Sequence, residues 1–186
     1  MSSDAFDQLM GASDPAMVVV TTVAEDEFAG CLVGFHSQSS IDPEEYCVWL
    51  SKANHTYRVG LRASHFAIHF LTAADLEVAE WFGTRSGETS DKFAGSDRGA
   101  GPDDGGAGRV GGYEFDIDEH GLPLLRACPN RMVVERLAIV DDGGDHACFT
   151  TSVRSARSEA AFTPLRFGDV AHLDPGRSSE SRAVHP

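Results

Sequence analysis

The sequence predicts one mostly β domain, a closed antiparallel barrel with short flanking helices. Six or so segments are rich in β-branched and aromatic residues and are separated by acidic turns. Only two segments indicate helices, and strands and helices do not alternate as a parallel, doubly wound sheet would require. The length of 186 residues suits one domain with a substantial core.

The first half of the chain supplies most of the predicted strands, because apolar β-formers dominate each of them. These strands cover residues 17–24, 28–38, 46–52 and 65–72. In the fourth strand, alternation places Phe66, Ile68 and Phe70 on one face and His65, Ala67 and His69 on the other. We interpret the two histidines as partly exposed barrel side chains rather than metal ligands.

Two short helices and a hairpin complete the predicted elements. Helices are expected at 56–63 and at 75–82, where the acidic first residue suits a helix N-terminus. Strands at 131–140 and 146–156 flank the turn DDGGD and read as a hairpin, and a last strand is expected near 164–167. The predicted organisation is therefore a lead-in over 1–14, a domain over 15–173 and a flexible tail over 174–186.

A glycine-rich stretch over 95–112 contains a motif match that its surroundings do not support. Residues 106–111 match GxGxxG, the dinucleotide-binding pattern. That pattern requires a preceding strand and a following helix, whereas PDDGG precedes it here and GYEFDIDEHG follows. We therefore interpret this stretch as a flexible loop with a chance match.

Charge and composition exclude several classes of function. A net charge of -14 argues against nucleic-acid binding, and it means that any site for a phosphate-bearing ligand must be locally basic. Lys52 is the first positive residue of the chain. No apolar run reaches membrane-spanning length, and the acidic N-terminus is unlike a signal peptide, so we expect a cytoplasmic protein with reduced cysteines.

Seven segments, taken in order, resemble the flavin reductase family, the FMN-binding split barrels. They are GCLVGFHSQSSIDP (30–43), SKANHT (51–56), SHFAIHFL (64–71), AEWF (79–82), DKFAG (91–95), GLPLL (121–125) and GDH (144–146). The resemblance implies a homodimeric, six-stranded, Greek-key split barrel that binds FMN, or less often FAD, at the subunit interface. It also implies hydride transfer from NADH or NADPH to the flavin, often to supply a partner monooxygenase.

The resemblance also selects candidate site residues, each with a simpler structural reading beside it. The cofactor-binding candidates are Gly34, Phe35, His36, Ser37, Ser39, Ser40, Lys52, Asn54, His55, Thr56 and Lys92. Gly30 and Gly34 would let the backbone approach a planar ring, and the serines would bond its polar edge or form a polar loop. Lys52 and the helix start at Asn54 would hold a phosphate, although Asn54 also suits an ordinary N-cap.

His146 is the catalytic candidate, either as a neighbour of the nicotinamide or as a hairpin-loop histidine. The sequence departs from the usual family residues at Leu32, Phe35, Glu44 and Thr151. Hydride passes directly between two cofactor rings, so the reaction requires no acid–base pair from the protein. Two alternatives stay open: a flavin-binding carrier or sensor without reductase activity, and a split-barrel oxidase or deazaflavin-dependent reductase.

Overall fold

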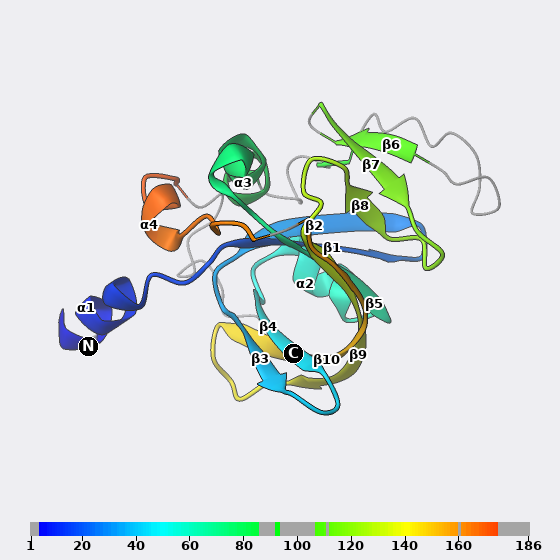
Figure 1. Cartoon of the computed structure of the whole chain (residues 1–186). Helices are drawn as coiled ribbons and strands as arrows, with labels where there is room; N and C mark the ends of the chain where they lie inside the picture. Colours follow the sequence, from blue (N-terminus) through cyan, green and yellow to red (C-terminus); the bar gives the residue numbers. More distant parts are fainter. Residues whose placement is uncertain (1–3, 86–91, 94–106, 111, 160, 175–186) are drawn as a thin grey trace.

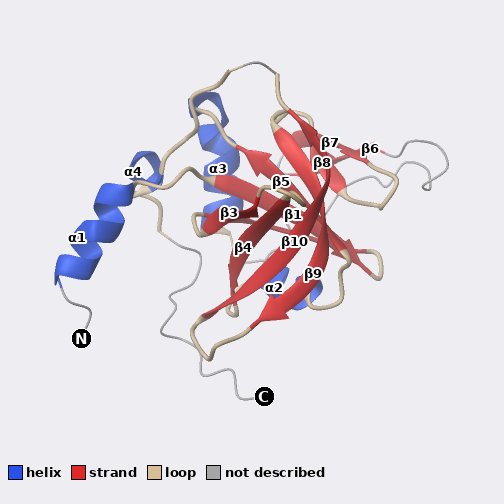
Figure 2. Cartoon of the chain, turned by 60° about the horizontal axis from the view of Figure 1, so that its bottom comes forward, coloured by secondary structure: helices blue, strands red, loops and turns tan. Residues whose placement is uncertain are grey.

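A strongly curled antiparallel sheet forms the body of the computed structural model, which describes residues 4–85, 92–93, 107–110, 112–159 and 161–174 (Figures 1 and 2). The sheet has seven strands in the order β2-β1-β5-β9-β10-β4-β3. The strands are β1 (Val18–Ala24), β2 (Glu27–Val33), β3 (His36–Ser40), β4 (Glu45–Ser51), β5 (His65–Phe70), β9 (Arg131–Val140) and β10 (His146–Arg157).

The mostly β prediction is confirmed, but the expected strand count and closure are corrected. The sheet is a half-barrel of seven strands, with β2 and β3 at its two edges. The stretch predicted as one strand over 28–38 is divided at Gly34 and Phe35. Its first part pairs with β1 and its second part with β4, so one continuous segment supplies both edges.

A second, three-stranded sheet was not predicted. It consists of β6 (Ala107–Val110), β7 (Tyr113–Ile117) and β8 (Pro123–Leu125). The loop interpretation of the GxGxxG match is therefore wrong at Ala107–Val110, whereas 94–106 and 111 lie outside the described residues. A Cβ on Gly108 would lie 2.3 Å from the Phe115 ring, so this glycine allows β6 to pack on β7. A strand follows the motif, which agrees with the rejection of a dinucleotide fold.

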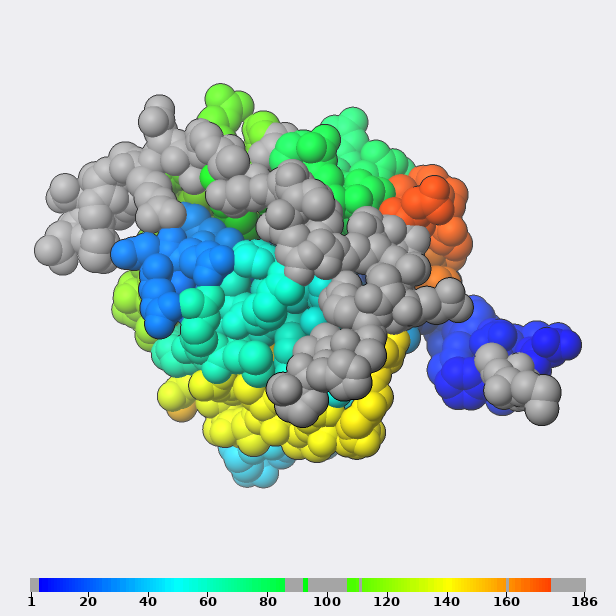
Figure 3. All heavy atoms as spheres, turned by 180° about the vertical axis from the view of Figure 1, so that it is seen from behind, coloured from blue at the N-terminus to red at the C-terminus, as the bar shows by residue number. Residues whose placement is uncertain are grey.

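The helices are short, and one of them, His55–Gly60, packs against the inside of the curl through Val59. Two match the predictions approximately, α2 (His55–Gly60) and α3 (Leu76–Thr84), the latter after a 3-10 turn at Ala73–Asp75. α1 (Asp4–Ser13) was not predicted; it has no buried residue and stands out from the body (Figure 3). No helix among the described residues is long and apolar enough to cross a membrane.

The last predicted strand, near 164–167, is corrected to two isolated bridges followed by a helix. Pro164 bridges to Thr72 and Arg166 bridges to Ala16, and α4 (Phe167–Val170) begins directly afterwards. Proline cannot donate to a strand ladder, which limits regular pairing at this point. Of the predicted tail over 174–186, only Asp174 belongs to the described residues.

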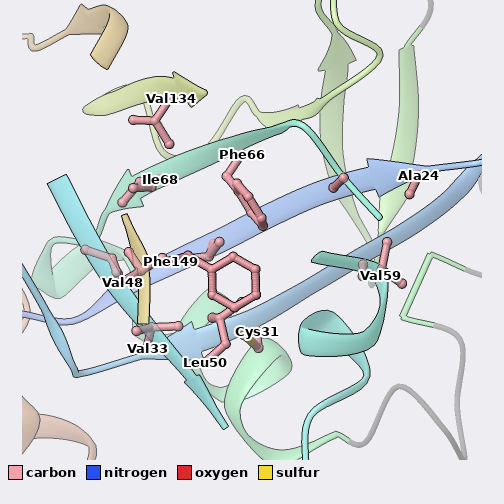
Figure 4. Packing of buried hydrophobic residues seen from close by; sticks show 14 residues of the cluster. Ala24, Cys31, Val33, Val48, Leu50, Val59, Phe66, Ile68, Val134 and Phe149 are labelled. Carbon is pink, nitrogen blue, oxygen red and sulfur yellow. The ribbon is translucent and has the colours of Figure 1, made fainter. Parts of the chain in front are cut away.

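Two apolar clusters lie on opposite faces of β1. Val18 and Val20 face the inside of the curl, where Phe66 and Phe149 meet edge to face with ring centroids 5.5 Å apart (Figure 4). Val19 faces the other way, toward α3 and the second sheet. A strand buried on both faces reads as a continuous apolar run, which explains the sequence MVVV.

The expectation of a partly exposed His69 is wrong. Its side chain is fully buried between β1 and β8. Nδ1 donates a hydrogen bond to the Val19 carbonyl at 3.2 Å, and Nε2 accepts one from the Leu125 amide at 3.1 Å. This arrangement requires the neutral ring, and burial lowers the pKa of His69 to about 3. The second sheet, which the sequence did not reveal, is what covers this histidine.

Candidate functional site

The candidate site lies at one edge of the curled sheet, where the segment before β3, the end of β4 and the β9–β10 turn meet. We call its five residues the open-edge cluster: Phe35, Trp49, Lys52, Asp141 and His146. Strand pairing brings them together, because the Trp49 amide donates to the Phe35 carbonyl at 2.8 Å and His146 lies opposite Ser51.

An exposed aromatic surface forms the first half of this cluster. The Phe35 ring is 59% exposed and meets the His146 ring at a centroid distance of 5.1 Å and an angle of 55°. Val48 and Leu50 point into the core, so alternation directs Trp49 outward, where it is 36% exposed. An exposed cluster of aromatic rings at a sheet edge is suited to stacking with a flat ligand.

His146 is held in one orientation by its neighbour in sequence. Its Nδ1 donates to the Asp145 carboxylate at 2.8 Å. This hydrogen bond is the main cause of a lowered pKa for Asp145. A carboxylate can only accept, so the Nδ1 position carries the proton and Nε2 is the acceptor of a neutral ring.

Lys52 supplies the positive charge of the cluster. Its Nζ lies 2.6 Å from Asp141 Oδ1, and its backbone amide donates to the Asp145 carbonyl at 2.9 Å. The hydrogen bond from Lys52 is the main cause of a lowered pKa for Asp141. Both ends of Lys52 are thus fixed by the β9–β10 turn.

The start of α2 does not join Lys52 as a ready set of phosphate donors. The Asn54 side chain accepts from the Thr56 amide at 3.1 Å, and the Asn54 carbonyl accepts from the Tyr57 amide at 3.1 Å. The Thr56 side chain is buried beside the Cys31 thiol, and His55 pairs with Glu27 at 3.1 Å. The helix start is therefore capped by the chain itself.

Lys92 lies in the interior rather than in the open-edge cluster. It is 5% exposed, and its ammonium donates to the carbonyls of Gly30 at 2.9 Å and Phe82 at 2.8 Å. Burial lowers its pKa. Lys92 thereby joins β2 to α3, with His55 and Thr56 lining the same small hollow.

The remaining candidates divide between the two faces of β3. His36 turns inward: Nε2 donates to the Ala16 carbonyl at 2.8 Å, and Nδ1 accepts from the Tyr46 hydroxyl at 2.6 Å. Burial lowers its pKa, in agreement with a neutral ring. Ser37 and Ser39 are exposed and Ser40 is half-buried. By alternation Ser37 shares the outward face with Phe35, so its hydroxyl lies on the same side of the sheet as the aromatic surface.

Gly30 and two departures from the family pattern are explained by packing. A Cβ on Gly30 would lie 2.7 Å from the Phe82 ring, so the close approach at this glycine is made by α3. Leu32 packs against Gly83 of the same helix. The Thr151 hydroxyl is buried and donates to the Tyr46 carbonyl at 2.8 Å.

Sequence reasoning missed Trp49 and the pairing role of Asp141. Trp49 had a usable signal, since alternation in the strand over 46–52 places it opposite to Val48 and Leu50. Asp141 had none, because its partner Lys52 is 89 positions away and the turn DDGGD accounts for the aspartate by itself.

The family comparison gives one match over most of the chain. Residues 10–171 match the model of the flavin reductase like domain. A curated relative, the FMN reductase (NADH) SmoA of Agrobacterium fabrum, is 25% identical over 155 residues, which is 83% of this chain and 76% of the relative.

Solved structures share the fold at lower identity. The FMN-binding protein of Thermus thermophilus with bound 1-cyclohex-2-enone gives a TM-score of 0.62 at 22% identity, covering 76% of this chain and 69% of that one. The flavin reductase HpaC complexed with NADP+ gives 0.65 at 15% identity, covering 88% and 94%. The predicted fold class is thereby confirmed, with seven strands in place of six.

Proposed function

The chain belongs to the flavin reductase like domain family, and we propose that it binds FMN at the open-edge cluster and reduces it with a nicotinamide nucleotide. The name of the SmoA relative supports FMN as the flavin and NADH as the first reductant to test. The complex of HpaC with NADP+ keeps NADPH as the second.

One observation carries the proposal: the exposed Phe35–His146 ring contact and the Lys52–Asp141 ion pair both lie at the β9–β10 turn. The two rings are 5.1 Å apart, and the amide of Lys52 is bonded to the residue next to His146. FMN combines a flat ring with a phosphate, so an aromatic surface with a cation near it suits both parts of the molecule. The residues of this edge fit that demand, and Ser37 adds a hydroxyl.

The protein's part in the reaction is to bind and orient. Bound FMN would supply the hydride acceptor, as flavins do. Phe35 and Trp49 would hold the ring by stacking, and Lys52 would attract the phosphate. His146, fixed by Asp145, would present Nε2 toward the nicotinamide and limit its orientations. Such positioning raises the rate by placing donor and acceptor atoms in reach of each other.

The test is a flavin titration followed by NADH oxidation on the same preparation. We expect quenching of flavin fluorescence and flavin-dependent consumption of NADH. The substitution His146→Ala should lower kcat/KM for NADH and leave the FMN dissociation constant within about twofold. His172→Ala is the matched control, because His172 is exposed, lies after α4 and faces Glu80 at 3.8 Å.

Three outcomes discriminate among the possibilities. Absence of FMN binding at tens of micromolar, an order-of-magnitude ceiling for a specific site, would contradict the proposal. Binding without NADH or NADPH oxidation would favour the carrier or sensor alternative. Equal kinetics in His146→Ala and wild type would make His146 a loop residue, and the nicotinamide would have to be oriented elsewhere.

We also propose a homodimer. The observation that supports it is α1, a helix whose apolar residues Phe6, Leu9 and Met10 are 48–65% exposed. Such a surface is common at interfaces between subunits. Light scattering coupled to size exclusion should give twice the mass of 19.9 kDa. A monomeric mass at micromolar concentration would contradict this part of the proposal.

Supply of reduced flavin to a partner monooxygenase would additionally require that the reduced flavin leave this protein.

A further inference from the structure

We propose that Asp141 competes with the flavin phosphate for Lys52, so that FMN binds as an exchanging substrate rather than as a tightly held cofactor. This inference rests on the proposed function, because it concerns how the same cluster receives FMN. It assigns to Asp141 a role as a positioning residue that acts through Lys52.

The first argument is the geometry of the ion pair. The Lys52 ammonium and Asp141 Oδ1 are 2.6 Å apart, the distance of a strong charge-assisted hydrogen bond. The lysine side chain is only 17% exposed, whereas the carboxylate is 43% exposed. The carboxylate thus lies on the solvent side, where a phosphate would have to arrive.

The second argument is that Asp141 is held in place. The same Oδ1 accepts a hydrogen bond from the Gly143 amide at 2.9 Å, which closes the turn around the aspartate. The carboxylate therefore keeps its position without the lysine. A phosphate can reach the ammonium only by sharing it with this fixed negative charge.

The third argument is the local balance of charge. Asp145 belongs to the same turn as Asp141 and also interacts with the charge of Lys52, so two carboxylates stand near one ammonium. The amides of Thr56 and Tyr57 at the start of α2 are already bonded within the chain. A dianionic phosphate would consequently gain little net attraction at Lys52, since repulsion from nearby carboxylates offsets it.

The decisive variant is Asp141→Asn, which removes the charge and keeps an oxygen for the Gly143 amide. FMN and riboflavin share a ring and differ in the phosphate, so their dissociation constants separate phosphate effects from ring effects. We expect Asp141→Asn to strengthen FMN binding by about three- to tenfold and to leave riboflavin within about twofold.

Asp142→Asn is the matched control, because it removes the same charge from the same turn. Asp142 Oδ1 accepts from the Gly144 amide and makes no contact with Lys52 among the described residues. This variant should leave both dissociation constants within about twofold. In the double variant Asp141→Asn with Lys52→Met, the gain in FMN affinity should disappear. Equal thermal midpoints for the two single variants would show that the turn is intact.

Several results would overturn the inference. An unchanged ratio of FMN to riboflavin affinity in Asp141→Asn would show that the carboxylate does not compete. Weaker FMN binding in that variant would show that Asp141 orients Lys52 for the phosphate instead. If wild type binds FMN and consumes NADH in either case, the proposed function stands and only this inference fails. Absence of flavin binding in all variants would overturn both.

Discussion

The only two lysines of the chain occupy opposite kinds of environment. Lys92 is buried and donates to two backbone carbonyls, so its partners are fixed parts of the fold. Lys52 lies at the open edge and is paired with one carboxylate of a surface turn. An ammonium paired with a surface carboxylate can still be shared with a ligand's phosphate, whereas an ammonium enclosed by two buried carbonyls cannot.

The same contrast holds for two histidines. His69 is enclosed and bonds only backbone groups, whereas His146 contacts an exposed phenyl ring and a carboxylate. Polar residues of the interior therefore join layers of the fold, and those of the open edge remain available to a ligand. Burial and partner type separate these roles, and residue type alone does not.

The variant that tests the contrast between the two lysines most strongly is Lys92→Met. The substitution leaves the carbonyls of Gly30 and Phe82 without their donor, and we expect the free energy of unfolding to fall by about 3 kcal/mol. Urea denaturation measures the change. Lys52→Met is the control and should leave the denaturation midpoint unchanged, since exposed ion pairs contribute little. Equal midpoints for both variants would remove the distinction between the two lysines.

The two glycines predicted to let the backbone approach a flavin ring, Gly30 and Gly34, provide the next test. Gly30→Ala should lower the free energy of unfolding by about 2 kcal/mol, because its Cβ would lie 2.7 Å from Phe82. At Gly34 the nearest atom to an added Cβ is Met17 Sδ at 3.4 Å, an ordinary contact. Gly34→Ala should therefore be tolerated. If Gly34→Ala is the more destabilising of the two, the packing argument for Gly30 is wrong.

A pH series sharpens the contrast between the histidines. The pKa of His69 is lowered from 6.5 to about 3, so the unfolded chain takes up a proton below pH 6.5 and the folded protein does not. Stability is thus full above pH 6.5 and falls as pH decreases toward 3. Between pH 7.5 and 5.5 the loss from this group should be about 1.4 kcal/mol. His69→Gln should remove this contribution of His69 from the denaturation profile, whereas His146→Gln should retain it.

The smallest expected effect concerns Lys52 itself. Because Asp141 already pairs with the ammonium, Lys52→Met should weaken FMN binding by only about fivefold. Riboflavin binding should remain within about twofold, as measured by fluorescence quenching. A loss of similar size for both ligands would place Lys52 under the ring rather than at the phosphate.

Much of the fold could be predicted because its signals are local. The strands over 46–52 and 65–72 and the hairpin around DDGGD carry β-branched residues and a turn that act over a few positions. The division at Gly34 and Phe35 could not be predicted in this way. Its cause is non-local, since β2 and β3 find partners at opposite edges of the sheet.

The site was predictable only in part for the same reason. Segment order pointed to Phe35, Lys52 and His146, and strand pairing does bring them together. The sequence placed Lys92 in the same set. In the structure Lys92 is buried between β2 and α3, and no local pattern in the sequence reveals that contact.

The position of the β9–β10 hairpin has a consequence for co-translational folding of the chain. β9 pairs with β5 and β10 pairs with β4, so among the described strands only this late hairpin joins two strand groups made much earlier. Until about residue 157 has emerged, β4 and β5 each expose an unpaired apolar edge. The nascent chain should therefore depend on holding chaperones during that interval, and a stall before the hairpin should yield aggregates rather than a partly active protein.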